Sequence, residues 1–168
     1  MTDVVLDLET LGTTSDSAVL SIGAVALVEP REDFYVVIDK PSGAVDAGTV
    51  LWWLRQHEAV RGAVQSGQPE VSALLLFADW LALRRGEGTL RLWGSEDFDT
   101  VILGNAYGRN GMERPWHYQE PRGLRTLFEF RGIDEDAIPW EGTEHIAIDC
   151  ARHAAVALRL ALDGERQS

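Results

Sequence analysis

The stretch VVLDLETLG, residues 4–12, constrains the fold and the chemistry of this chain more than any other. Its apolar residues predict a buried strand, in which successive side chains point to opposite faces of a sheet. Asp7 and Glu9 are two positions apart, so both carboxylates lie on one face, where like charges repel each other. A cation between them removes that repulsion. We therefore expect a divalent metal ion there; the alternative is a pair of acids at a solvent-exposed sheet edge.

Strand and helix patterns alternate along the rest of the chain in the order of an α/β protein. Residues 3–7, 17–28 and 33–39 are apolar runs joined by short polar links, which predict an antiparallel meander. The elements expected after the meander are helices at 49–65, 69–85 and 98–109, a strand at 89–94, a short helix within RGLRTLFEFRG, and a final helix at 145–162. This order predicts one α/β domain over residues 1–168, with a mixed sheet between helices.

Composition narrows the classes of protein. The net charge of −12 over 168 residues argues against a protein that coats nucleic acid, because affinity for phosphates comes largely from Lys and Arg. It is compatible with an enzyme that holds a strand end through metal ions. A single cysteine, Cys150, excludes an intrachain disulfide and a zinc site built from several cysteines. The acidic start MTDVVLDLE and the short apolar run at 73–78 predict a soluble, cytoplasmic protein without a signal peptide or a membrane span.

Further acids and one histidine stand where other elements begin. Asp99 follows the fourth expected strand at a helix start, and His145 and Asp149 open the last helix. Each acid alone is explained equally well as a helix cap or a partner of the helix dipole. Together with Asp7 and Glu9, however, they fit phosphodiester cleavage by two metal ions about 4 Å apart, which needs converging carboxylates and suits Mg²⁺ or Mn²⁺. A histidine nearby takes the proton of the attacking water.

The chain resembles the DEDDh family of 3′–5′ exonucleases, and within it the phage and prophage exonuclease domains of the exodeoxyribonuclease VIII type. The stretches that carry the resemblance occur in the family's order: DLETLG (7–12), SIGAV (21–25), LWWLRQ (51–56), LWGSEDFDTVILGNAYGRNGMERPW (92–116) and EGTEHIAIDCARHAA (141–155). The resemblance implies a ribonuclease H-like α/β fold with a mixed five-stranded sheet flanked by helices. It also implies hydrolysis from a 3′ end with Mg²⁺ or Mn²⁺, two ions per site.

The resemblance also assigns roles to residues of the three motifs. The metal ligands are Asp7, Glu9 and Asp99. The general base is His145. The residues that meet the 3′-terminal nucleotide are Thr10, Leu11 and Phe98. The implied partner is the 3′ end of DNA or RNA, preferably single-stranded, and no membrane is involved. A homodimer is also compatible with the resemblance, since many relatives of this fold form dimers.

The third motif departs from the family pattern at the fourth metal-binding position. The family has His, four residues, then Asp, whereas here the fifth residue after His145 is Cys150 and Asp149 comes one place earlier. On an ideal helix Cys150 borders the apolar stripe that includes Ala147, while Asp149 is rotated about 100° onto a polar face with His153. Two interpretations stay open. Either an irregular helix start turns Asp149 into the site as a metal ligand, or Asp149 is a surface acid and Cys150 a small, inert, buried residue. Cys150 as the fourth metal ligand is a less favoured alternative, because a thiolate is a poor match for a hard cation.

The loop before Asp99 is also shorter than the family pattern. Only Ser95, Glu96 and Asp97 separate WG from FD, and they add two acids near the path of a phosphate backbone. These departures leave two functions open. The first is a metal-dependent 3′–5′ exonuclease. The alternative is a catalytically impaired exonuclease homologue that binds a nucleic-acid end or a protein partner.

Overall fold

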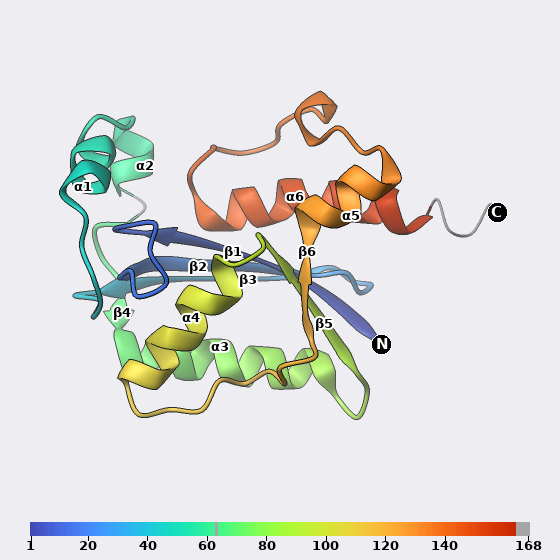
Figure 1. The fold of residues 1–168 in the computed structure, drawn as a ribbon, viewed down its shortest axis with the longest axis horizontal. Helices are drawn as coiled ribbons and strands as arrows, with labels where there is room; N and C mark the ends of the chain where they lie inside the picture. The colour runs from blue at the N-terminus through green and yellow to red at the C-terminus, as the bar shows by residue number, and fades with distance from the viewer. Residues whose placement is uncertain (63, 164–168) are drawn as a thin grey trace.

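The computed structural model describes residues 1–62 and 64–163, and its centre is a mixed six-stranded sheet of order β4-β3-β2-β1-β5-β6 (Figure 1). The strands are β1 (Thr2–Thr10), β2 (Val19–Ala26), β3 (Glu32–Asp39), β4 (Gln68–Pro69), β5 (Leu90–Gly94) and β6 (Pro121–Gly123). Strands β1 to β3 form the antiparallel meander that the sequence predicts, and β5 and β6 extend it in parallel. The sequence patterns predict four of these strands and the family resemblance implies five; the edge strands β4 and β6 are too short to show a periodic pattern.

Helices cover both faces of this sheet, with α3 and α4 on one side and α5 and α6 on the other (Figure 1). The helices are α1 (Ala47–Leu54), α2 (Glu58–Gly62), α3 (Glu70–Arg85), α4 (Asp99–Arg109), α5 (Leu124–Arg131) and α6 (Ala147–Asp163), with a 3₁₀ turn η1 (Glu135–Ala137). The prediction of a single helix over 49–65 is wrong. Helix α1 ends in a tightened turn at Arg55, whose N–H donates a hydrogen bond to the Trp52 carbonyl, and α2 begins afterwards. Within the described residues, no helix has the length and apolar character needed to cross a membrane.

The alternation of β1 decides which side chains reach each face. Val4 and Leu6 belong to the core beneath α3 and α4, whereas Val5 belongs to the core beneath α5 and α6. Odd-numbered side chains of β1 therefore point toward α5 and α6. Asp7 and Glu9 share that face, as the spacing of the acids predicts.

Gly23 in β2 allows the first turn of α6 to lie directly on the sheet. It is the register partner of Asp7 across the β1–β2 pair. A Cβ at this position would overlap the carbonyl group of Ala147, the first residue of α6. The SIGAV stretch thus sets the start of α6 beside Asp7, and with it the side chains of that first turn.

Candidate active site

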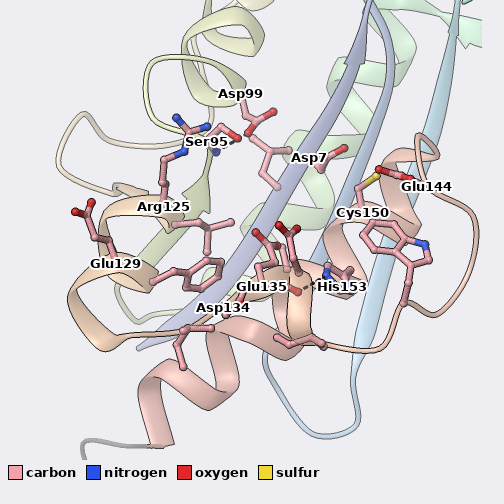
Figure 2. A pocket seen from close by; sticks show the side chains of 18 residues that line it. Asp7, Ser95, Asp99, Arg125, Glu129, Asp134, Glu135, Glu144, Cys150 and His153 are labelled. Atoms are coloured by element: carbon pink, nitrogen blue, oxygen red, sulfur yellow. Dashed lines mark hydrogen bonds between the residues drawn. The ribbon is translucent and has the colours of Figure 1, made fainter.

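Two clefts meet at Asp7 and Cys150, at the carboxyl end of β1. The acidic cleft has a volume of about 700 Å³ and lies between β1, α5 and α6 (Figure 2). The acids that line it include Asp7, Asp99, Glu129, Asp134, Glu135 and Glu144. The aromatic cleft, of about 600 Å³, lies between β1, α1 and the start of α6; the residues that define it are Glu9, Thr10, Trp52, Trp53, Phe98 and His145. The sequence-predicted residues are thus distributed over two adjoining hollows rather than one.

Asp7, Glu9 and Cys150 form a tight group at this junction. A carboxylate oxygen of each acid and the Cys150 Sγ all lie within 4.8 Å of one another. Burial raises the pKa of Asp7 well above its ordinary value, and the charges of Asp99 and Glu9 raise it further. Burial raises the pKa of Glu9 to about 7, with the charge of Asp99 adding to the effect. The carboxylates therefore repel each other in a partly buried site.

In the part of the chain that the structure describes, no cationic side chain pairs with these carboxylates. Among residues 1–62 and 64–163, none of the ion pairs that the structure contains involves Asp7, Glu9 or Asp99. Buried carboxylates without a positive partner destabilise a fold unless another ion compensates them. Oxygen ligands converging on one point are the donors that divalent cations prefer. The residues present therefore fit a divalent metal ion.

Asp99 is the first residue of α4 and is almost completely buried. The backbone N–H of Ser95 donates a hydrogen bond of 2.7 Å to its Oδ2, which Figure 2 marks with a dashed line. Burial raises the pKa of Asp99 to about 6, while hydrogen bonds from the backbone of Ser95 and Leu8 act in the opposite direction. The helix start expected at this position is confirmed, and it holds the Asp99 carboxylate on the acidic cleft.

His145 lies in the aromatic cleft, just before α6 begins. Its backbone has a φ of +66°, in the left-handed region that non-glycine residues rarely adopt. The side chain is 39% exposed, and its ring packs edge-on against Trp52 with the ring centroids 4.8 Å apart. The imidazole is thus oriented by an aromatic ring, and it stays open to exchange protons with water.

Two of the three residues expected at the 3′-terminal nucleotide line the aromatic cleft. Thr10 lies at the end of β1 and donates its hydroxyl hydrogen to the Gly12 carbonyl at 2.6 Å, and Phe98 precedes α4. Leu11 does not line the cleft. It packs instead against a small apolar cluster that contains Leu20, because the chain turns directly after β1.

Trp52 is a cleft residue that sequence reasoning did not assign to the site. Adjacent residues diverge on a helix, and Trp53 is accordingly buried, with its Nε1 donating to the Thr10 carbonyl at 2.9 Å. Trp52 remains 39% exposed and faces the cleft beside His145. The adjacent tryptophans of LWWLRQ were the available signal, since only one of the two can enter the core.

Asp149 points away from the metal-binding group. Its carboxylate accepts hydrogen bonds of 2.9 Å from the Thr143 backbone N–H and from Arg152. Arg152 also binds Asp33 of β3 at 2.8 Å, so Asp149 ties the loop before α6 to the sheet. The irregular helix start that would turn Asp149 inward does not occur, and Cys150 takes the position beside Asp7.

The environment of Cys150 differs from that of an ordinary core cysteine. The side chain is half-buried and lines both clefts. Burial raises the pKa of its thiol, and the charges of Asp7 and Glu9 raise it further. The thiol is therefore protonated as long as no cation lies among the three side chains.

The expectation that His153 lies on a polar face of α6 is wrong. Its side chain is buried, its ring packs against Trp140 with the centroids 4.1 Å apart and the planes tilted by 35°, and its Nε2 lies 3.3 Å from the Glu135 carbonyl oxygen. The segment between α5 and α6 folds back over the helix and covers a face that an isolated helix would present to water (Figure 2).

The short loop before Asp99 has a structural use. Glu96 accepts a hydrogen bond of 2.7 Å from the backbone N–H of Thr126, in the first turn of α5. An acid at a helix N-terminus satisfies a free N–H group and complements the helix dipole. One of the two extra acids therefore caps a helix, and the loop fixes α5 against the start of α4.

Comparison with known proteins supplies a family and a fold. Residues 2–162 match the family model of the 3′–5′ exoribonuclease Rv2179c-like domain. No curated protein matches the chain.

Two solved structures of E. coli exonuclease I are similar to this chain. In the complex with a dT13 oligonucleotide, the TM-score is 0.63 at 16% identity over 99% of this chain and 41% of that chain. In the complex with a dA16 oligonucleotide, the TM-score is 0.59 at 18% identity over 95% of this chain and 40% of that chain. The chain therefore spans about two fifths of exonuclease I, and the likeness shows that it has the same helix-flanked exonuclease fold of the ribonuclease H-like type.

Proposed function

The chain belongs to the 3′–5′ exoribonuclease Rv2179c-like domain family, and from that premise we propose that it is a metal-dependent exonuclease that shortens single-stranded RNA from the 3′ end. Family membership and fold support a nuclease that acts on nucleic-acid 3′ ends. The observation that carries the metal-dependent part is the convergence of Asp7 and Glu9, uncompensated, on the cleft that also holds His145.

Asp7, Glu9 and Asp99 are the residues that would hold Mg²⁺ or Mn²⁺, with two ions per site by the resemblance to DEDDh enzymes. When bound, such ions supply Lewis-acid stabilisation of the negative charge that develops on the phosphate. The rest of the chemistry falls to the chain itself. His145 accepts the proton of the attacking water at a ring nitrogen and, being 39% exposed, returns it to solvent. Trp52 keeps the ring in place during this exchange.

The aromatic cleft supports a single-stranded substrate end. Trp52 and Phe98 offer ring faces for unstacked bases, and a stacked base is worth about 1–3 kcal/mol. The net charge of −12 supports a protein that holds the end of a strand rather than its length. RNA is favoured over DNA because the family is described as exoribonuclease, although the exonuclease I structures hold DNA oligonucleotides. The proposed relationship to phage exonuclease domains rests on the motif resemblance alone. The same holds for the proposal of a homodimer.

The test is an assay on matched 5′-labelled single-stranded RNA and DNA with Mn²⁺, Mg²⁺ or EDTA. We expect a ladder that shortens from the 3′ end, faster on RNA, and that disappears with EDTA and in Asp7→Ala. Asp79→Ala is the matched control, since this acid is exposed on α3, on the opposite face of the sheet. Metal-dependent cleavage that survives Asp7→Ala would contradict the site, and faster cleavage of DNA would contradict the choice of RNA.

A second candidate function is a catalytically impaired homologue that binds an end without cutting it. The observation that favours it is Cys150 at the position where the family resemblance expects an aspartate. Binding of a 3′ end with no turnover in the wild type, together with cleavage gained in Cys150→Asp, would support this candidate over the active enzyme.

A further inference from the structure

We infer that Cys150 is a metal ligand, and that its thiolate shifts the preference of the site from Mg²⁺ toward borderline-soft divalent cations such as Zn²⁺ and Co²⁺. The inference rests on the proposed function only in that both use the Asp7–Glu9 site. It concerns which cation binds there and through which atoms, and it can be tested without measuring cleavage.

Geometry places the thiol among the ligand atoms. The Cys150 Sγ and one oxygen each of Asp7 and Glu9 lie within 4.8 Å of one another. In protein sites zinc lies about 2.3 Å from sulfur and about 2.0–2.2 Å from carboxylate oxygen. Two donors that share a tetrahedral ion are thus about 3.6 Å apart, so side-chain rotations that move the ligand atoms by about 1 Å bring all three onto one cation. On binding, the thiol releases its proton to solvent and the sulfur–metal bond forms.

The backbone holds the thiol in this position. The Cys150 N–H bonds to the Ile146 carbonyl at 3.0 Å, in the first turn of α6. Ala147 and Ala151 on either side are fully buried, and Gly23 fixes the contact of that turn with the sheet. The cysteine therefore lies among the ligands as a rigid part of the fold rather than as a mobile surface group.

The buried acids provide an independent observation that a cation belongs here. Glu9 is only 9% exposed, and it shares the junction of the clefts with Asp7. No ion pair within residues 1–62 and 64–163 involves either carboxylate. What this site lacks is positive charge, and a cation that binds the two acids also meets the sulfur.

The other acid of the motif does not compete for this place. Asp149 is bonded to the Thr143 N–H and to Arg152, which in turn binds Asp33. A site of one thiolate and two carboxylates is softer than a site of carboxylates alone. Mg²⁺ demands oxygen ligands in octahedral geometry, whereas Co²⁺ and Zn²⁺ accept sulfur and rank above Mn²⁺ in affinity.

The experiment uses Co²⁺ as a spectroscopic probe on the full chain, freed of any histidine tag. We expect wild-type protein to show a near-ultraviolet sulfur-to-cobalt charge-transfer band. The band should be absent in Cys150→Ser and kept in the matched control Asp149→Asn. Zn²⁺ should abolish the band at stoichiometric amounts, whereas Mg²⁺ should leave it in place even in large excess. In Cys150→Asp, the ratio of Mg²⁺ to Zn²⁺ affinity should rise by at least about 10-fold.

A measurement on wild-type protein guards against a misfolded variant: X-ray absorption of the zinc-loaded chain should show a sulfur neighbour at about 2.3 Å. Co²⁺ binding without the band, or zinc without sulfur, would overturn the inference. So would an absence of any Co²⁺ binding. If the band appears but RNA is not cut, the inference stands and the proposed function fails. If RNA is cut but the bound metal has no sulfur ligand, the proposed function stands and the inference fails.

Discussion

Strand β1 carries acids at both ends on the same face of the sheet, and the structure surrounds them differently. At the amino end, Arg91 Nε and Trp93 Nε1 donate to the Asp3 carboxylate at 2.6 and 2.7 Å. Arg91 is the register partner of Asp3 on β5, so the sheet itself supplies the counter-charge. At the carboxyl end, the register partner of Asp7 is Gly23, and the partner of Glu9 is Ser21.

The difference separates an acid that holds the fold together from acids that strain it. The Asp3 charge is compensated within the sheet, whereas Asp7 and Glu9 repel each other and have raised pKa values because they are buried. Such a site opposes folding unless an external cation enters it. The two ends should therefore respond in opposite ways to removal of charge.

The largest effect is expected for Asp7→Asn. Activity on RNA should fall by at least about 10³-fold, because a metal ligand is lost. The free energy of unfolding of the metal-free protein should rise by about 1–3 kcal/mol, because an uncompensated buried charge is removed. Cleavage rates and urea unfolding in EDTA measure the two quantities.

Asp3→Asn is the matched control at the other end of β1. It breaks the ion pair with Arg91, so the free energy of unfolding should fall by about 1–3 kcal/mol, while cleavage by the folded protein should change little. If both variants were destabilised to the same extent, the contrast between the two ends would be broken.

His145→Ala should lower the turnover rate by about 10²-fold while leaving metal affinity close to that of the wild type. We assign the imidazole a role in proton transfer. It does not neutralise the charge of the neighbouring carboxylates, so metal binding does not depend on it. Single-turnover cleavage and calorimetric metal titration measure the two properties. His117→Ala, at an exposed loop position, is the control. Loss of metal binding in His145→Ala with unchanged turnover at saturating metal would reverse this assignment.

The stability of metal-free protein should fall as pH rises from about 4.5 to 7. Burial raises the pKa of Glu9 from 4.5 to about 7 and that of Asp99 from 3.8 to about 6, so the folded state binds more protons than the unfolded chain in this window. The stabilisation is fully present below the ordinary carboxyl range and is lost above pH 7, at about 3 kcal/mol for each of the two groups.

Urea unfolding at several pH values in EDTA measures this dependence. Glu9→Gln should flatten it, and saturating Mn²⁺ should reverse it, because metal binding requires ionised carboxylates. The opposite result would be a free energy of unfolding, without metal, that rises with pH to the same extent in the wild type and in Glu9→Gln. It would show that the protein itself compensates the charges of these acids.

The smallest effect is expected for Gly23→Ala. The new Cβ meets the Ala147 carbonyl and pushes the start of α6 off the sheet, so stability should fall by about 1–2 kcal/mol and metal affinity by up to about 10-fold. Gly108→Ala, in α4 with open space around it, should stabilise by about 0.5–1 kcal/mol. Thermal unfolding with and without Mn²⁺ measures the stability and the metal affinity. If Mn²⁺ raised the melting temperature of Gly23→Ala as much as that of the wild type, Gly23 would not be needed to form the metal site.

Local periodicity explains what the sequence could predict. The alternation in VVLDLETLG placed Asp7 and Glu9 on one face, and the structure confirms their proximity. The start of α4 at Asp99 follows from the apolar spacing after it. The helical wheel also placed Cys150 inward, which depends only on 3.6 residues per turn.

What the sequence could not show depends on contacts between distant segments. The wheel gave the direction of Cys150, but its approach to Glu9 depends on Gly23, more than a hundred positions away, so the thiol looked merely inert. His153 was misplaced because the segment that covers it has no pattern that predicts its course. The three-residue strand β6 likewise takes its form from its pairing with β5.

The most direct test of the account is calorimetric titration of Mn²⁺ into wild-type protein and Asp7→Asn, at neutral pH in two buffers of different ionisation enthalpy. We expect saturable binding to the wild type with release of protons, because buried carboxylates must ionise to bind the ion, and severely weakened binding to Asp7→Asn. Equal binding to both proteins, or no binding to the wild type, would contradict the claim that the carboxyl end of β1 is built for a metal ion.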